Sequence, residues 1–458
     1  MDGVAFVAQE YHADGALRPA RYEIEGAEAT GWRIRRDGAP HLDFGPGYRV
    51  LRASHCGVCA TDLARRHLPF PLPQVTGHEV VALGDGGRPV VVEINASHAA
   101  RGLVTDCPWC GLEMGSHCPD RRVLGIHDLP GGFSPWILAP RAAIHAVPPA
   151  IDPLTATLVE PFAAALAAVR MATRVPRRRI AVLGPRRLGS LVVAALAAWR
   201  RRAGAGYEIL ALARRPELRA LATACGADDA RDPDALHEPI ADVVVDTTGS
   251  PAGFARALAL ASGEVHLKTT CGEPSCGLAH ATAMVVDEIA LVPLRDDLAA
   301  PFDGPRLATA VVLPGAPRDL RPAGLRLLSE REAPALPLGG ADVVVAGSLA
   351  EVDAAVRPRA DRERGLVRPR GVVVLADTGQ TRDALTAAVL DRGISVTTSR
   401  CGDFATALDV LPDVGTDLAP RLVSNVMASS RLADAFATAA HPSAIKVVVT
   451  HPEATLLA

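Results

Sequence analysis

The sequence predicts an α/β protein in which an irregular β domain precedes a doubly wound parallel sheet. Residues 1 to about 150 are rich in Gly, Pro, His and Cys and carry short β-like runs between turn residues, which is typical of an irregular β domain. From about residue 153, helical patterns alternate with short strand patterns, and serial βαβ units require a parallel sheet covered on both faces. The pentapeptide ADVVV begins at Ala241 and again at Ala341, which indicates an internal repeat.

Composition excludes several classes of protein. The 458 residues predict about three domains, and 49% apolar with 22% charged residues is typical of a globular chain. The net charge of −3 lacks the basic excess of proteins that coat nucleic acid or anionic membranes. No apolar run approaches the ~18 residues that span a bilayer, and no secretory signal is visible. We therefore expect a cytoplasmic protein that acts on a small molecule, with no nucleic-acid or membrane partner.

The elements follow from the periodicity of apolar residues. In the β domain, strands are expected at YRVLRAS, RPVVVEI and PWILAP. In the α/β part, the predicted helices span residues 154–172, 187–202, 218–227 and 251–261. The predicted strands between and after them span residues 178–184, 207–215, 241–249 and 263–270.

We expect four segments along the chain: a zinc-binding β domain at 1–165, a dinucleotide-binding domain at 166–295, an insertion at 296–393, and a return to both at 394–458. The insertion begins with a Pro/Arg-rich stretch and continues with ADVVVAGSLAEVDAAV and RGVVVLADTG. We interpret these strings as a duplicated strand-helix-strand unit, which extends the sheet or forms a small lobe of its own. The alternative is that buried parallel strands resemble one another.

A thiol, an imidazole and a carboxylate at Cys59, His78 and Glu79 form a donor set that suits Zn²⁺. Five of the nine cysteines lie between residues 56 and 118, and such clustering in a reducing compartment indicates metal ligands. Alone, the string GHE is a weak signal, because a lone histidine on a strand usually belongs to the core. The pairing of CGVCATD with TGHEVV, followed by LVEP with Glu160, is much more specific.

In these motifs and in their order, the sequence resembles the medium-chain zinc-dependent alcohol and polyol dehydrogenases. The resemblance extends through VLGIHDLPGGFSPWILAP, the turn after Val182, TTGSP, VVDEIALV, SRCGDF and AIKVVV. It leaves out the first ~45 residues and the insertion. It implies a GroES-like catalytic domain formed by both chain ends, with a Rossmann-type domain inserted between them.

The resemblance also implies roles for single residues. Cys59 and His78 become catalytic zinc ligands, with Glu79 or Glu160 completing the shell or exchanging there during turnover, whereas Cys56 is not a ligand. The implied chemistry is Lewis-acid catalysis, in which zinc lowers the pKa of the substrate alcohol before hydride leaves.

Two further side chains near Cys59 receive roles from the resemblance. Asp62 would accept the second N–H of His78 and fix its tautomer, although it could simply cap a turn. Thr61 matches the hydroxyl that takes the alcohol proton, although it could simply be a surface threonine. Many relatives carry His or Glu where this chain has Ala64, so the end of the proton relay is open and His67 is a candidate.

A second zinc site is implied by DCPWCGLEMGSHCPD. Cys107, Cys110 and Cys118 reproduce the last three ligands of the structural zinc loop of the family, and His98 stands where its first cysteine is expected. Three cysteines and one histidine are an accepted tetrahedral set. The alternative for His98 is an unbound surface histidine.

The cofactor turn departs from the usual pattern. LGPRRLG keeps Gly184 and Gly189, with Leu188 before the latter, but Arg186 occupies the middle place of G-x-G-x-x-G, where the backbone normally approaches the pyrophosphate. At the end of the second strand, Arg214 and Arg215 stand where an acidic residue would bind the ribose of NAD. Their charge favours the 2′-phosphate of NADP over NAD, although solvated arginines after a strand are common.

The predicted function is a zinc-dependent NAD(P) alcohol or polyol dehydrogenase, expected as a dimer or tetramer. The main alternative is a degenerate, non-catalytic relative with a binding or regulatory role, which Arg186 and the insertion favour and the zinc constellation opposes. A zinc-free enone reductase is a weaker alternative, because it would not need Cys59, His78 and Glu79.

Overall fold

The computed structural model describes residues 3–67, 70–269, 272–295, 301–302, 305–317, 320, 322, 324–357, 365–379, 382–415 and 417–452. Contacts divide the chain into two compact units, one formed by residues 1–163 and 403–458 and the other by residues 164–402. The predicted fold class, an irregular β domain with a parallel α/β sheet, is confirmed. In the described part, no helix combines the length and apolar character that crossing a membrane requires.

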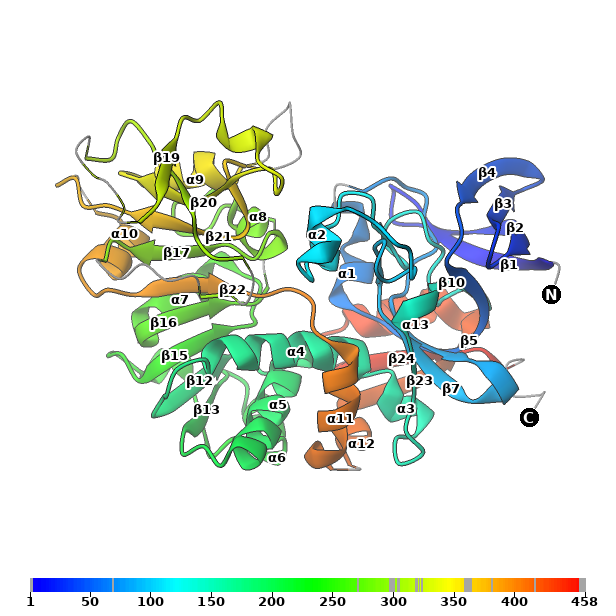
Figure 1. Ribbon diagram of the computed structural model, residues 1–458. Helices are drawn as coiled ribbons and strands as arrows, with labels where there is room; N and C mark the ends of the chain where they lie inside the picture. Colours follow the sequence, from blue (N-terminus) through cyan, green and yellow to red (C-terminus); the bar gives the residue numbers. More distant parts are fainter. Residues whose placement is uncertain are drawn as a thin grey trace. The chain divides into compact units, whose positions relative to one another are not determined.

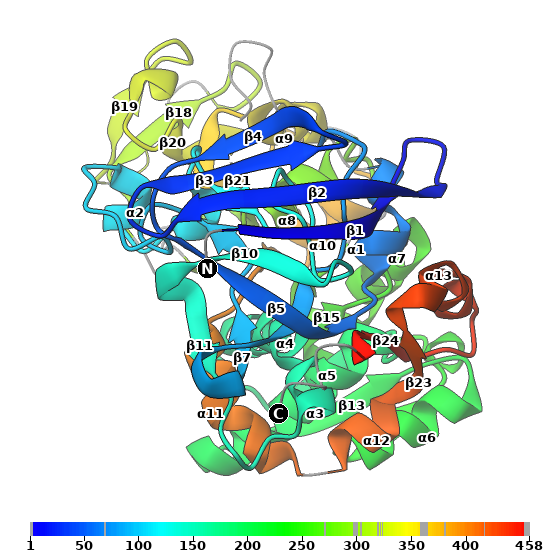
Figure 2. The same cartoon turned by 90° about the vertical axis from the view of Figure 1, so that its right-hand side faces the viewer.

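The first unit begins with a four-stranded antiparallel meander, β1-β2-β3-β4, which Figure 2 shows as one sheet. Alternating residues of these strands are buried, among them Ile24 and Ile34, as expected for a sheet with one face on a core. The strands are β1 (Gly3–Tyr11), β2 (Leu17–Ala27), β3 (Gly31–Arg36) and β4 (Ala39–Phe44).

A second sheet of the first unit joins the two ends of the chain. Its order is β11-β7-β6-β5-β24-β23, with β10 also paired to β5. The central strand β5 lies between β6 and β24, so Gly57 pairs with Glu79 on one side and with Val448 on the other. This pairing brings the C-terminal strand beside the predicted metal ligands. The strands are β5 (Tyr48–Gly57), β6 (Glu79–Leu83), β7 (Pro89–Val92), β10 (Trp136–Pro140), β11 (Ile144–Ala146), β23 (Val423–Ala428) and β24 (Lys446–Thr450).

The segments between the sheets of this unit contain a small ladder and several helices. A two-stranded ladder pairs β8 (Asn95–Ala96) with β9 (Arg122–Val123). The helices are α1 (Ala60–Leu63), α2 (Pro108–Gly111), α3 (Pro153–Ala156), α11 (Phe404–Val414), α12 (Leu418–Leu422) and α13 (Leu432–Ala440). Helix α4 (Val159–Ala172) crosses the boundary between the units. The single helix predicted at residues 154–172 is therefore two helices, because the chain leaves the first one at Thr157.

The second unit is built on one eleven-stranded sheet, with the order β14-β13-β12-β15-β16-β22-β17-β21-β20-β18-β19 (Figure 1). Consecutive valines at 243–245 and at 343–345 are all fully buried, so both faces of the sheet are covered. The strands are β12 (Arg179–Leu183), β13 (Glu208–Leu212), β14 (Asp229–Arg231), β15 (Ala241–Asp246), β16 (Ala261–Leu267), β17 (Ala290–Pro293), β18 (Thr309–Val312), β19 (Arg326–Leu328), β20 (Ala341–Ala346), β21 (Val367–Leu375) and β22 (Ser395–Thr398).

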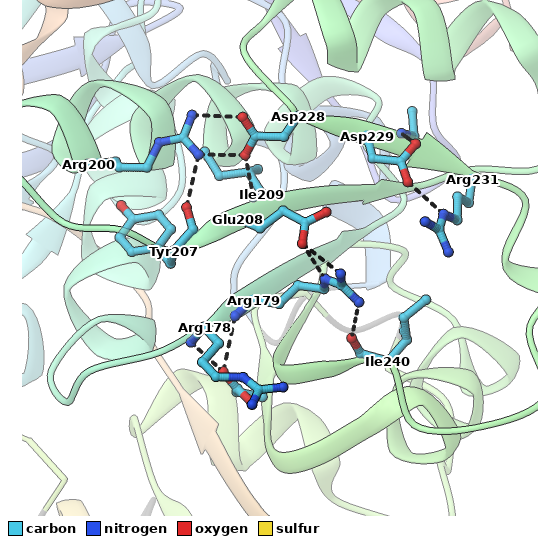
Figure 3. Close-up of polar contacts among 12 residues, drawn as sticks. Arg178, Arg179, Arg200, Tyr207, Glu208, Ile209, Asp228, Asp229, Arg231 and Ile240 are labelled. Atoms are coloured by element: carbon cyan, nitrogen blue, oxygen red, sulfur yellow. Dashed lines mark hydrogen bonds and ion pairs between the residues drawn. The ribbon is translucent and has the colours of Figure 1, made fainter.

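The helices of this unit pack against neighbouring strands. Helix α5 packs on β12 and β13, α6 on β13 and β14, α7 on β15 and β16, and α9 on β20 and β21. Ion pairs hold the edge of this region, where Arg179 contacts Glu208 and Arg200 contacts Asp228 (Figure 3). The helices are α5 (Arg187–Ala203), α6 (Pro216–Ala224), α7 (Pro251–Leu260), α8 (Ala281–Val286), α9 (Leu349–Val356) and α10 (Ala384–Leu390).

The insertion does not form a lobe of its own. Its strands β18 to β21 belong to the same sheet as β12 to β16 and run parallel to one another, so the repeated ADVVV string forms an additional parallel strand. Parts of the Pro/Arg-rich stretch, and Thr270 at the end of the predicted strand 263–270, lie outside the described residues.

Candidate functional site

The first candidate metal group lies where β5 leads into α1 and where β6 begins. Cys59 directly precedes α1, while His78 and Glu79 stand at the start of β6. One ligand atom from each of the three residues lies within 4.8 Å of the others. The structure therefore brings together Cys59, His78 and Glu79 as the sequence predicted.

Asp62 connects the two segments that carry these donors. Its buried carboxylate accepts a hydrogen bond from the backbone N–H of Cys59 at 2.8 Å and from that of Gly77 at 3.1 Å. Oδ1 of Asp62 also lies 3.4 Å from Nδ1 of His78. Burial alone would lower the pKa of His78, but the charges of Asp62 and Cys59 raise it well above its usual value. The surroundings of His78 thus favour the positively charged form of its imidazole.

Glu79 is engaged by a lysine from the other end of the chain. Nζ of Lys446 donates to both carboxylate oxygens of Glu79 at 2.6 Å, and both side chains are buried. Burial lowers the pKa of Lys446, but the charges of Glu79, Cys59 and Glu160, together with the hydrogen bonds to Glu79, outweigh it, so the net shift is upward. Gly57 makes room for the carboxylate, because a Cβ there would meet Oε2 of Glu79 at 2.0 Å. Glu79 is therefore a donor already neutralised by a cation.

The other predicted residues lie at varying distances from this group. Thr61 is half-buried, and its hydroxyl lies 3.6 Å from Sγ of Cys59. Glu160 is outside the three-residue group but acts electrostatically on Lys446. Cys56 is also outside it, and burial raises the pKa of its thiol. His67 is exposed and accepts a hydrogen bond from Arg66.

The second candidate metal group has four members, His98, Cys107, Cys110 and Cys118, which again lie within 4.8 Å of one another. Sγ of Cys107 lies 3.9 Å from Sγ of Cys118. Nδ1 of His98 lies 3.4 Å from Sγ of Cys118 and 3.7 Å from Sγ of Cys110. The other ring nitrogen of His98 faces the carboxylate of Asp120 at 3.6 Å. His98 thus joins the three cysteines and does not lie apart on the surface.

The two groups differ in what they could hold. Three thiols and an imidazole form a complete tetrahedral set for zinc. Burial, followed by the neighbouring thiols, raises the pKa of Cys118 to about 12, a cost that a cation would relieve because metals bind the thiolate. At the first group, Cys59 and His78 are two donors for zinc, and Glu79 is shared with Lys446.

The predicted cofactor turn lies between β12 and α5. Gly184 has φ +84°, and a Cβ there would lie 2.9 Å from Cγ2 of Thr248. A Cβ on Gly189 would meet the carbonyl oxygen of Gly184 at 2.5 Å. Both glycines are therefore required by the tight turn and by the close approach of α5, whatever the turn binds.

Arginines surround the start of α5. The backbone N–H of Arg186 donates to the carbonyl of Gly184 at 2.7 Å, and Leu188 is half-buried. Burial lowers the pKa of Arg186, and the charges of Arg187 and Arg215 lower it further. Arg214 pairs with Asp234 at 2.7 Å, and Arg215 pairs with Glu217 at 3.4 Å. Of these two arginines, only Arg215 is among the charges that act on Arg186.

Sequence reasoning missed Lys446 and Asp246. The chain has only two lysines, Lys268 and Lys446, and both are buried. In a chain that otherwise uses arginine, this was the available signal. Asp246 ends β15, where burial raises its pKa to about 6. Its Oδ2 atom is buried without a hydrogen-bond partner among the described residues, and no motif indicated that.

A family profile described as the alcohol dehydrogenase GroES-like domain matches residues 45–149. The L-galactonate-5-dehydrogenase of Escherichia coli (strain K12) is 30% identical over 179 residues, which are 36% of this chain and 49% of that protein. The (R,R)-butanediol dehydrogenase of Bacillus subtilis (strain 168) is 30% identical over 230 residues, 44% of this chain and 61% of that protein. The matched segments thus span about half to three fifths of these relatives.

The fold also resembles that of solved structures. The structure of the alcohol dehydrogenase RspB from E. coli CFT073, complexed with cofactor NADH, has a TM-score of 0.59 and 16% sequence identity. The superposition covers 97% of this chain and 99% of that one. At this identity, the likeness concerns the fold alone.

Proposed function

The chain belongs to the medium-chain dehydrogenase/reductase family, and from that premise we propose that it is a zinc-dependent oxidoreductase. It would transfer a hydride between an alcohol or polyol and a nicotinamide dinucleotide. The observation that carries the proposal is the meeting of Cys59, His78 and Glu79 around the buried carboxylate of Asp62. Stability alone does not require a thiol, an imidazole and two carboxylates in one buried place.

The donor set fits zinc, and each residue has a task. Cys59 and His78 would hold the ion, and Asp62 would orient His78 through Nδ1. Bound zinc supplies Lewis-acid chemistry, which lowers the pKa of an alcohol hydroxyl. Lys446 holds Glu79 through both carboxylate oxygens, which leaves a coordination position for substrate. Thr61 would accept a hydrogen bond from the substrate hydroxyl and pass its own hydroxyl proton on toward solvent.

We further propose that the second group holds a structural zinc ion. His98, Cys107, Cys110 and Cys118 supply four donors and leave no position for substrate. Elemental analysis of the full chain should then find close to two zinc ions per chain. A chain with one ion, lost when Cys110 is replaced by alanine, would limit zinc to this group and contradict the catalytic site.

For the cofactor we propose NADP over NAD. Arg186 and Arg187 at the start of α5 and Arg215 directly before α6 support this choice, because a 2′-phosphate adds charge that arginines bind well. One charge-assisted hydrogen bond corresponds to about a tenfold preference or somewhat more. Arg215→Ala should remove most of the preference in a titration, whereas Arg214→Ala, which breaks the pair with Asp234, should change it less.

The deciding experiment is a spectrophotometric screen of alcohols and polyols with each cofactor, in the presence and absence of bound zinc. Turnover that depends on zinc supports the proposal. A protein that binds neither NADPH nor NADH would favour the non-catalytic alternative, since Arg186 places a side chain in the cofactor turn. Metal-free protein with full activity would contradict the role of Cys59 and His78.

A further inference from the structure

The eleven-stranded sheet consists of two arrays of parallel strands that run in opposite directions and meet at one antiparallel pair, β22 and β17 (Figure 1). Outward from this pair, the first array continues as β16, β15, β12, β13 and β14. The second array continues as β21, β20, β18 and β19. Because the chain visits β12, β13, β15 and β16 in the same order as β18, β19, β20 and β21, the two arrays share one topology.

Local details recur at corresponding positions. Strands β15 and β16 shift register between Ala241 and Val243, and β20 and β21 shift between Ala341 and Val343. A bulge at the same place in two strand pairs is not explained by general strand composition, because it depends on local backbone geometry.

The polar contacts recur as well. Oδ2 of Asp242 accepts from the backbone N–H groups of residues 178 and 179 at the start of β12. Oδ2 of Asp342 accepts from those of residues 308 and 309 at the start of β18. Ser250 caps α7 and Ser348 caps α9 in the same manner. These shared contacts indicate a duplicated unit.

In chain order, the first repeat runs from β12 to β17 and the second from β18 to β22. The last strand of each repeat pairs with the other repeat. From β16 the chain passes through α8 to β17, which pairs in parallel with β21. From β21 it passes through α10 to β22, which pairs in parallel with β16. The connection from β16 to β17 passes over β22, and the connection from β21 to β22 passes over β17. The two repeats therefore exchange their last strands within one chain.

A buried row of polar side chains determines which strand lies beside β16. His266 hydrogen-bonds Thr397 through Nδ1 and Ser399 through Nε2, each at 2.9 Å. Thr397 donates to Glu264 at 2.5 Å. Nζ of Lys268 donates to the hydroxyl and the carbonyl of Ser399, at 3.1 and 3.0 Å.

Strand β17 could not replace β22 in that place. Its sequence, ALVP, has no side chain that donates or accepts a hydrogen bond. With β17 beside β16, both ring nitrogens of His266 would lose their partners, and unpaired buried polar groups are costly. Glu264 would lose Thr397 but keep its ion pairs with Arg174 and Arg177. The polar row thus specifies the exchanged arrangement.

The described residues of the second repeat, β18 to β22, lack the features of a cofactor site. Between β18 and β19, the described residues form no helix, whereas α5 follows β12. The carboxylate of Glu351 accepts hydrogen bonds from the backbone N–H groups of Gly315 and Gly347, at 2.7 and 2.8 Å. Glu351 thus occupies backbone N–H groups in the turns that follow β18 and β20. Asp246, at the end of β15 in the first repeat, corresponds to Ala346, at the end of β20 in the second.

We propose that residues 309–398 are a shortened second copy of the dinucleotide-binding unit and serve as its built-in partner. Through the antiparallel pair of β22 and β17, the second copy covers the sheet edge at which a separate copy of this chain would otherwise add a strand. This proposal does not depend on the proposed catalytic activity, because it concerns strand pairing within one unit of the chain.

Hydrogen exchange of the full-length protein tests the built-in partner. Peptides that cover β17 and β22 should be among the most slowly exchanging, and their protection should stay constant over on the order of a hundredfold range of protein concentration. If protection of these strands falls on dilution, or if they exchange as fast as the outer strands β14 and β19, a second chain supplies the partner and the proposal is wrong.

Disulfide trapping tests the exchange. The pair Val265→Cys and Val396→Cys should form a cross-link on oxidation, identified by mass spectrometry of linked peptides, because these residues are neighbours on β16 and β22. The control pair Val265→Cys and Leu291→Cys should not, because β22 separates β16 from β17. A cross-link in the control pair alone would overturn the exchanged arrangement.

Stability of a variant provides a second measurement that does not need a cross-link. Thr397→Val keeps the shape of the side chain but removes the hydroxyl that contacts His266 and Glu264. We expect a clearly lower denaturation midpoint, with faster exchange in both β16 and β22. Ser395→Ala, on the same strand outside the polar row, should change neither. Unchanged stability of Thr397→Val would contradict the role of the polar row.

Discussion

The two candidate metal groups use similar residues in opposite ways. His98, Cys107, Cys110 and Cys118 offer four donors from one loop region. At Cys59 and His78, the third candidate donor, Glu79, is bound on both oxygens by Lys446. The first arrangement closes a coordination shell, and the second keeps it incomplete.

The two groups differ in what the rest of the chain adds to them. Both donor sets lie within about twenty positions, and a metal held by the four-donor group stabilises the local fold. At Cys59, His78 and Glu79, the C-terminal strand β24 adds a buried lysine, whose charge balances the excess negative charge. An incomplete shell has little use for stability, whereas catalytic sites need an open position.

The largest expected effect comes from removing one cysteine from each group. Cys59→Ala should lower turnover by more than about a thousandfold, since Lewis-acid stabilisation amounts to several kcal/mol, while the melting temperature changes little. Cys110→Ala should lower the melting temperature by about 5–15 °C and leave turnover near normal below that temperature. Turnover assays and calorimetry on both variants check this dissociation.

One result with these two variants would contradict the contrast between a catalytic and a structural metal group. If Cys59→Ala unfolds the chain as readily as Cys110→Ala, the two groups play the same structural part. Zinc content, measured on the same preparations, controls for loss of the wrong ion, because each variant should lose one ion and keep the other.

Gradual removal of metal should separate the groups in time. A chelator should inactivate the enzyme before it lowers the melting temperature, because the ion with fewer protein donors leaves first. Activity, zinc content and melting temperature are followed on the same sample. Simultaneous loss of activity and stability would indicate that the two ions are held equally.

The next effect concerns Lys446. Lys446→Met leaves the buried carboxylate of Glu79 without its partner, and breaking such a buried pair costs about 3–5 kcal/mol. The double variant Lys446→Met, Glu79→Gln should recover most of this stability, because both charges are then gone. Chemical denaturation of the two variants measures the difference. A single variant as stable as the parent would show that Glu79 does not depend on the lysine.

Sequence reasoning located most of the donors, because each motif lies within a short stretch. Cys59, His78 and the three loop cysteines could be predicted from spacing and resemblance, and His98 was predicted from its place after EIN. Lys446 was not predicted, because 367 positions separate it from Glu79 and only the pairing of β24 with β5 brings them together. The string AIKVVV indicated a strand but not its neighbour.

The α/β unit shows the same limit. The helices and parallel strands could be predicted from periodicity, and the repeated ADVVV indicated extra strands. The exchange of β17 and β22 could not be predicted, because it depends on contacts between Glu264, His266 and Thr397, which lie far apart in the sequence. Likewise, the sequence does not show that Arg214 pairs with Asp234, whereas Arg215 pairs with Glu217 and acts on Arg186.

The smallest expected effects compare the carboxylates that face the two ligand histidines. Asp62 is buried, and it also accepts the N–H groups of Cys59 and Gly77. Asp120 contacts His98 at 3.6 Å with a side chain that is 68% exposed. Asp62→Asn should weaken zinc binding at the first group by about 10–100-fold, whereas Asp120→Asn should weaken it at the second by only about threefold, as for an exposed pair. Competition with a chromogenic chelator measures both affinities. Equal losses of zinc affinity in the two variants would mean that burial of the carboxylate does not matter. The contrast between the catalytic and the structural group would then not extend to the carboxylates that contact their histidines.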